Sequence, residues 1–228
     1  DAVPHLICGG FTKEETENAL IDLQFLGIDN VLVLRGDARK ADATFVPTPG
    51  GHAYASGLLK QVTQMNQGKY LHQEHDDTFK TDFCIGVAGY PEKHFESPNL
   101  KTDFKYLKKK VDLGADFIVT QMFYDVQKYI DFVEQCRKND IHVPIIPGLK
   151  PITSSKQLVS LPKLFHIDVP EALSEAVSSC KSEAEVKEVG IEWMIHQGKE
   201  LVKIGAPVLH FYTMSNPGPT KKIAEAIF

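Results

Sequence analysis

The chain has 228 residues, 43% of them hydrophobic and 24% charged, which is typical of a folded globular protein rather than a disordered or low-complexity one. Its 25 Lys and Arg against 30 Asp and Glu give a net charge of -5, so no global basic surface is available for nucleic acid or an anionic membrane. No run approaches the roughly 20 apolar residues that span a bilayer. We therefore expect neither nucleic-acid nor membrane partners.

The cysteines are widely spaced and form no CxxC motif, which argues against a zinc ribbon or a dithiol redox centre. We expect no metal site, and free thiols are typical of a reducing, cytoplasmic compartment. The four positions are Cys8, Cys84, Cys136 and Cys180.

Short apolar, β-branched runs alternate with segments of helical period, the pattern of a parallel α/β fold. Near-continuous apolar character predicts strands that are covered on both faces. The six predicted strands are 4–8, 30–34, 82–88, 116–120, 143–147 and 207–211.

The helical segments carry recognisable signals. Thr12 to Glu15 is a capping box, and Gly27 predicts the end of the helix that it starts. Two helical segments are predicted between residues 170 and 204. Apolar residues at helical spacing are Ala19, Leu20, Leu23 and Leu26 in the first helix, Phe104, Leu107 and Val111 in a later one, Val126, Ile130, Val133 and Cys136 or Arg137 in the next, and Ile191, Met194, Ile195 and Leu201 near the end.

The stretch 68–81 is polar and aperiodic, and we interpret it as a loop insertion. Its run from His72 to Asp77 resembles a metal cluster, but a solvated loop is the better interpretation. No GxGxxG, GxxxxGK[ST], GxSxG or HExxH motif is present, so dinucleotide-fold, P-loop and common hydrolase sites lack support.

Polar groups follow the carboxyl ends of five predicted strands, and this end of a (β/α) barrel is where ligands bind. The pattern predicts a TIM-barrel active site. The groups are Arg35-Gly36-Asp37, Tyr90 to His94, Gln121, Gly148-Leu149-Lys150 and Tyr212-Thr213.

Each group also has a structural interpretation. Arg35 and Asp37 could form a loop ion pair, and His5 and His94 could be ordinary hydrogen-bonding residues. Lys150 could be a Schiff-base lysine or a simple loop residue. Asp103 and Lys110 share a helix face at i, i+7, so Lys110 could meet an anionic group. Gln121 is less easily dismissed, because a half-buried amide needs partners.

Seven motifs, in order along the whole chain, resemble the methylenetetrahydrofolate reductase family. They are Pro4-His5-Leu6, Leu34-Arg35-Gly36-Asp37, Tyr54-Ala55-Ser56, Val87 to Glu92 with His94, Gly114-Ala115-Asp116 leading to Thr120-Gln121, Ile146-Pro147-Gly148 and His210-Phe211-Tyr212-Thr213.

The resemblance implies a flavoenzyme that feeds methionine synthesis. NADH or NADPH would reduce FAD, which would then pass hydride to 5,10-methylenetetrahydrofolate and give 5-methyltetrahydrofolate in a ping-pong sequence. It also implies a homo-oligomer. The FAD site would be lined by His5, Arg35, Gly36, Asp37, Tyr54, Ala55, Ala88, Tyr90, His94, Asp103 and Lys110.

Three residues have specific roles by the same resemblance. Asp37 would lie beside the flavin ring and modulate its electronics, and Gln121 would hydrogen-bond the pterin, so these two are the catalytic candidates. Tyr129 would contribute to the pocket shared by NAD(P)H and folate.

The chain departs from the family pattern at both ends. Asn216 stands where the family carries a folate-binding arginine, and we expect no regulatory domain. The two family strands before Pro4, including the general-acid glutamate, are not in the chain. We therefore expect a single partial TIM-barrel domain over 1–228, with about six of the eight β/α units. The alternatives are an inactive or flavin-binding-only fragment, and a lyase that uses Lys150.

Overall fold

The computed structural model describes residues 2–37, 44–72 and 79–228. Its six strands are hydrogen-bonded in chain order, and the pairs β1–β2, β2–β3 and β5–β6 are parallel. This is the predicted α/β fold, a parallel six-stranded part of a TIM barrel. The strands are β1 (His5–Ile7), β2 (Asn30–Leu34), β3 (Cys84–Gly89), β4 (Phe117–Met122), β5 (Ile145–Leu149) and β6 (His210–Phe211).

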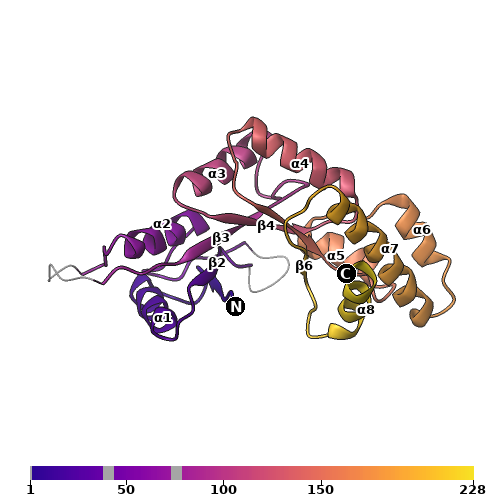
Figure 1. Cartoon of the computed structure of the whole chain (residues 1–228), viewed down its shortest axis with the longest axis horizontal. Coiled ribbons are helices and arrows are strands. Elements are labelled where there is room, and N and C mark those ends of the chain that lie inside the picture. The colour runs from indigo at the N-terminus through magenta and orange to yellow at the C-terminus, as the bar shows by residue number, and fades with distance from the viewer. Residues whose placement is uncertain (1, 38–43, 73–78) are drawn as a thin grey trace. The chain divides into compact units, whose positions relative to one another are not determined.

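Helices alternate with these strands along the chain (Figure 1). The last predicted strand, 207–211, is shorter than expected, since β6 holds only two residues. The helices are α1 (Lys13–Phe25), α2 (Ala55–Asn66), α3 (Leu100–Asp112), α4 (Val126–Lys138), α5 (Gln157–Phe165), α6 (Glu171–Ser178), α7 (Glu183–Lys203) and α8 (Pro217–Ile227).

The helix signals are largely confirmed. The Thr12 capping box is formed in both directions, and Gly27 follows α1 with a φ of +73° that favours glycine. Leu26, predicted as part of the apolar stripe, is 70% exposed at the end of α1 and does not join the core. Phe104 and Leu107 of α3 are buried as predicted.

The buried face of α4 differs from the predicted one. Cys136 is buried as predicted, together with Tyr129 and Phe132, whereas Val126, Ile130 and Val133 are only half-buried. The two aromatic rings, at helical spacing from Cys136, remove more surface from water than the valines, so the helix is rotated toward them.

The chain divides into two compact units, residues 1–88 with 105–118 and residues 89–104 with 119–228. In the first unit, α1 and α2 lie beside β2 and β3 (Figure 1). Gly86 of β3 is required here, because a Cβ would lie 2.4 Å from the ring of Phe117. Val31, Val33 and Leu58 are fully buried between the strands and helices.

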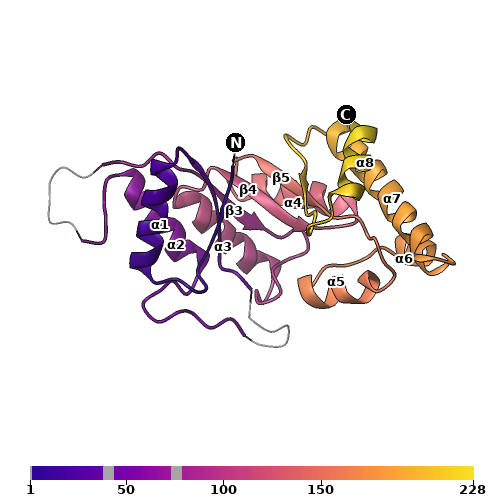
Figure 2. The same cartoon turned by 90° about the horizontal axis from the view of Figure 1, so that it is seen from below.

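In the second unit, the long helix α7 packs against α4, α6 and α8 (Figure 2). Trp193 donates from Nε1 to the carbonyl of Tyr124, and Gln197 donates from Nε2 to that of Phe123, both at 2.9 Å. These bonds attach α7 to the segment after β4.

Gly190 lets α7 approach the backbone that follows β5. A Cβ at this position would lie 1.8 Å from the carbonyl oxygen of Ile152, and backbone cannot yield as a flexible side chain can. The close approach therefore fixes the segment from Lys150 to Ile152 against the helix.

None of the described helices is long and apolar enough to cross a membrane. All four cysteines are free thiols. Burial raises the pKa of Cys8 to about 11 and that of Cys136 to about 12, so both stay protonated at neutral pH.

Substitution of Gly190 should be strongly destabilising. We expect Gly190→Ala to lower the free energy of unfolding by about 3 kcal/mol, because α7 must move away from Ile152. Glu192→Ala, at an exposed position of the same helix, should change it by less than about 0.5 kcal/mol. Urea denaturation followed by circular dichroism measures both. Equal stability of the two variants would contradict the close packing.

Candidate functional site

The loop after β2 carries three predicted site residues. The carbonyl of Arg35 accepts from the Cys8 amide at 3.1 Å, which ties the loop to the end of β1. Gly36 has a φ of +85°, which L side chains rarely adopt, and its backbone passes close to Ile7. The guanidinium of Arg35 lies 5.1 Å from the Phe45 ring centre, while Asp37 is exposed.

Two further predicted residues lie at the start of α2. Tyr54 is its N-cap residue and is 66% exposed, and Ala55 begins the helix. No side chain caps this end, so the first N–H groups remain for an external acceptor. His5 lies on β1 and is exposed.

Lys110 is held at the carboxyl end of β3. Its ammonium donates to the carbonyl of Ala88 at 2.6 Å, which brings these two predicted residues together. The helix α3 is thereby attached to the strand end, and the positive charge is placed at a defined position.

The loop from Tyr90 to Ser97 is organised around His94. The rings of Tyr90 and His94 are perpendicular, with centroids 4.6 Å apart. Asp103 accepts from the His94 amide at 3.1 Å and from the Ser97 hydroxyl at 2.7 Å, so one carboxylate closes the loop. Three predicted site residues, Tyr90, His94 and Asp103, are therefore assembled within the second unit.

Lys93 holds the same loop from the other side. Its ammonium donates to the carbonyls of His94 at 2.9 Å and Ser97 at 2.6 Å. Its own φ is +94°, an unfavourable conformation for a residue with a side chain. The two charge-assisted hydrogen bonds offset part of that cost and fix the orientation of His94.

Glu92 connects this loop to the segment before α6. Its carboxylate accepts from the Asp168 amide at 3.1 Å. Burial is the largest cause that raises the pKa of Glu92 to about 7; the carboxylates of Asp168 and Asp125 also raise it, while the Asp168 amide and Lys128 oppose the shift. Nearby, Phe95 stacks on His166 with centroids 4.2 Å apart.

At the end of β4, Gln121 is half-buried and its Oε1 accepts from the Met122 amide at 3.0 Å. In the described part of the chain its amide nitrogen makes no hydrogen bond, so this donor is available to a ligand. The neighbouring Thr120 is fully buried. Its hydroxyl accepts from the Gly148 amide at 2.9 Å, and its carbonyl accepts from the Tyr212 hydroxyl at 2.8 Å.

Tyr129 lies in the core rather than at the surface of the site. It is 4% exposed, its hydroxyl donates to the carbonyl of Ile145 at 2.7 Å, and its ring stacks on Phe123. Its hydroxyl is therefore already bonded within the core. Asn216 is exposed before α8.

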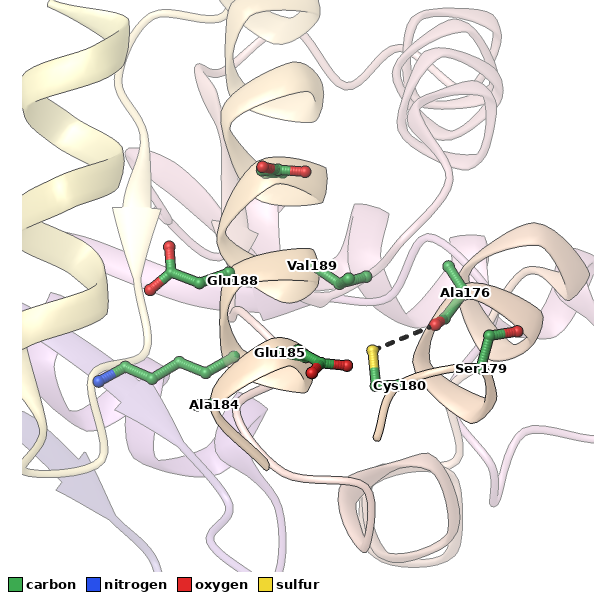
Figure 3. A pocket seen from close by; sticks show the side chains of 9 residues that line it. Ala176, Ser179, Cys180, Ala184, Glu185, Glu188 and Val189 are labelled. Carbon is green, nitrogen blue, oxygen red and sulfur yellow. Dashed lines mark hydrogen bonds between the residues drawn. The ribbon is translucent and has the colours of Figure 1, made fainter. Parts of the chain in front are cut away.

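A surface depression of about 640 Å³ lies elsewhere (Figure 3). Figure 3 shows it between α6, with Ala176 and Ser179, and α7, with Glu185 and Val189. Cys180 donates from its thiol to the carbonyl of Ala176 there. None of the predicted site residues lines this open depression, and its carboxylates do not converge on a buried polar group, so we do not assign the function to it.

The run His72 to Asp77 falls mostly outside the described residues, among which no metal-binding group is found.

The structure thus places the predicted residues in two groups, each within its own unit. Glu92 and Lys93 belong to the predicted group Tyr90 to His94, but sequence reasoning gave neither of them a role. It missed the Phe95–His166 contact, because the αL conformation of His166 and its stacking partner leave no local signal.

Comparison with known proteins identifies the family. The family model "Methylenetetrahydrofolate reductase" matches residues 1–227. The chain belongs to the methylenetetrahydrofolate reductase family. It is 36% identical over 228 residues to methylenetetrahydrofolate reductase 1 of Schizosaccharomyces pombe, covering all of this chain and 36% of that protein.

Bacterial members are also similar. The 5,10-methylenetetrahydrofolate reductase of Escherichia coli is 31% identical over 218 residues, covering 94% of this chain and 66% of that protein. The chain thus spans about a third of the length of the yeast relative. Among solved structures, an uncharacterized Clostridium thermocellum protein that binds two copies of 5-methyl-5,6,7,8-tetrahydrofolic acid has a TM-score of 0.57 at 18% identity, over 98% of this chain and 71% of that one. At this identity the match shows the fold alone.

The raised pKa of Glu92 has a consequence for stability. Between pH 4.5, near the ordinary pKa, and about 7, the folded chain holds a proton that the unfolded chain has released. This contribution is fully present below pH 4.5 and is lost as the pH rises to about 7. We expect Glu92→Gln to be more stable than the parent at pH 8 by about 1 to 2 kcal/mol, a value reduced for partial solvent screening.

Urea denaturation at pH 4.5, 6, 7 and 8 measures this difference. Glu171→Gln, at an exposed position of α6, is the matched control and should reproduce the parent profile. A Glu92→Gln profile parallel to that of the parent would contradict the assignment.

Proposed function

We propose that this chain takes part in reducing 5,10-methylenetetrahydrofolate to 5-methyltetrahydrofolate, with NADH or NADPH as reductant and FAD as cofactor, in a ping-pong sequence. The family match over residues 1–227 carries the proposal. Relatives named for NADH, in Arabidopsis thaliana, and for NADPH, in Caenorhabditis elegans, support a nicotinamide reductant without selecting one.

The residues present fit an anionic dinucleotide cofactor. The Lys110 ammonium is fixed at Ala88, and the uncapped start of α2 at Tyr54 and Ala55 offers backbone N–H groups suited to phosphate. The positive φ of Gly36 gives a loop that a ligand can approach closely. When bound, FAD would supply the hydride transfer chemistry.

The remaining proposed cofactor residues position or shape the site. Tyr90, His94 and Asp103 would form one wall, because their loop is closed by the Asp103 carboxylate. Arg35 and Asp37 would contribute charges beside the cofactor, with His5 on the neighbouring strand.

Folate binding would depend on β4. The free amide N–H of Gln121 is a donor that suits a pterin carbonyl or ring nitrogen. The Clostridium protein that binds 5-methyltetrahydrofolic acid has the same fold, which supports a folate ligand. Tyr129 would support the pocket through packing, since its hydroxyl is already bonded to Ile145.

We also propose that the protein forms a homo-oligomer, works in the cytoplasm and serves methionine synthesis. The four free thiols are compatible with a reducing compartment. The lyase alternative, based on Lys150, receives no support from the family match.

The test is binding and turnover by the purified chain. We expect FAD absorbance with a shifted spectrum and reduction of bound FAD by NADH or NADPH. Formation of 5-methyltetrahydrofolate, followed by chromatography, should be slow, because the residues of this chain do not include the general-acid glutamate that the resemblance implies. Asp103→Ala should weaken FAD binding by at least about tenfold, because the loop that holds His94 loses its closing carboxylate. Asp112→Ala removes an exposed carboxylate from the end of the same helix and is the control. Failure of the parent chain to bind FAD and a folate would overturn the proposal.

Asp37→Asn tests the electrostatic role proposed for that carboxylate. Removal of a negative charge beside the cofactor favours its anionic reduced form, so the reduction potential should rise by about 30 mV or more. Spectroelectrochemical titration of both holoproteins measures the change. An unchanged or lowered reduction potential in protein fully loaded with FAD would contradict the proposal that Asp37 lies beside the flavin ring.

A further inference from the structure

Lys150 is a buried cation at the carboxyl end of β5. The residue is 6% exposed, and the residues around it in the chain, Leu149, Pro151 and Ile152, are buried as well. Lysine is among the residues that are almost never so buried unless paired. The position therefore requires a physical explanation.

The described residues provide no partner for its ammonium. No hydrogen bond or ion pair of Lys150 is found in ranges 2–37, 44–72 and 79–228. Burial alone lowers the pKa of Lys150, and no neighbouring carboxylate opposes this shift. Among the described residues, the fully enclosed side-chain polar atoms without a partner are Tyr124 Oη, Gln197 Oε1 and Thr220 Oγ1, so the ammonium of Lys150 stays reachable from solvent.

The backbone on both sides of Lys150 is fixed. On one side, the Leu149 carbonyl accepts from the Tyr212 amide at 2.9 Å. On the other, Ile152 lies directly against Gly190 of α7. A cation on such a rigid segment loses little conformational entropy when it binds a ligand.

Lys150 also belongs to the same sheet end as Gln121. Thr120, which precedes Gln121, binds the Gly148 amide through its hydroxyl and the Tyr212 hydroxyl through its carbonyl. The ends of β4, β5 and β6 are thus joined within the second unit, with Gln121 and Lys150 each following one of these contacts. Ligands of parallel α/β sheets bind at this end.

We propose that the Lys150 ammonium is a binding subsite for an oxyanion, a carboxylate or a phosphate, of a ligand that occupies the carboxyl ends of β4 and β5. The oxyanion supplies the counter-charge that none of the described residues provides at this position, and charge-assisted hydrogen bonds of this kind are strong. The inference rests on the proposed function, which supplies two sources of such an oxyanion, the glutamate of a folate and the phosphates of NADH.

Equilibrium dialysis of the full chain with defined probes tests the subsite. The probes are 5-methyltetrahydrofolate, the same compound without its glutamate, NADH, and dihydronicotinamide riboside, which has no phosphate. We compare the parent with Lys150→Met, which keeps the length of the side chain and removes its charge. Lys199→Met removes an equal charge from an exposed position of α7 and is the matched control.

We expect Lys150→Met to lose at least about tenfold in affinity for 5-methyltetrahydrofolate or for NADH, while its affinity for the matching probe without the oxyanion equals that of the parent. The probe affected identifies the source of the oxyanion. Lys199→Met should bind like the parent. Circular dichroism establishes that each variant is folded.

Two results would overturn the inference in distinguishable ways. If the parent and Lys150→Met bind all four probes equally, the subsite is wrong and the proposed function stands. If the parent binds neither 5-methyltetrahydrofolate nor NADH, the proposed function fails and the subsite fails with it. If borohydride traps a carbonyl compound on Lys150, the residue forms a Schiff base and the proposed oxyanion subsite is wrong.

Discussion

Thr120 is the residue on which the ligand-facing end of the second unit depends. Its side-chain hydroxyl accepts from the Gly148 amide and its main-chain carbonyl accepts from the Tyr212 hydroxyl, so one buried residue joins the ends of β4, β5 and β6. Gly148 must be glycine for this contact, since a Cβ would lie 2.3 Å from the Thr120 carbonyl. Gln121 and Lys150 take their positions from this arrangement.

The strands were predictable because their signal is local. Apolar runs such as 30–34 are buried on both faces, and the observed β2 has the predicted bounds. The candidate site residues were proposed from order and spacing. Arg35 and Tyr90 follow a strand, Gln121 lies near the end of β4, and parallel strands end on one side of a sheet. Helix phase was less predictable. In α4 both Val126 and Tyr129 could face the core, and the fully buried one is Tyr129, whose ring stacks on Phe123 of a distant segment.

Contacts between distant segments left no trace in the sequence. The approach of α7 to Ile152 can be seen only once the position of the helix is known, so the sequence alone does not single out Gly190. The raised pKa of Glu92 likewise arises first from its burial, which only the folded chain produces, and the charge of Asp168, distant in the chain, adds to it. Contacts and pKa shifts of this kind depend on tertiary geometry, whereas capping boxes and strand ends can be recognised from local sequence.

The contact of Gly190 with Ile152 also links two positions that no local motif connects. A larger residue at 190 would displace the segment that begins with Lys150. A substitution in α7 would therefore move the backbone at the end of β5. Related chains that carry a side chain at 190 must change the 150–152 segment as well. The two positions should therefore vary together during evolution, although only one of them follows a strand.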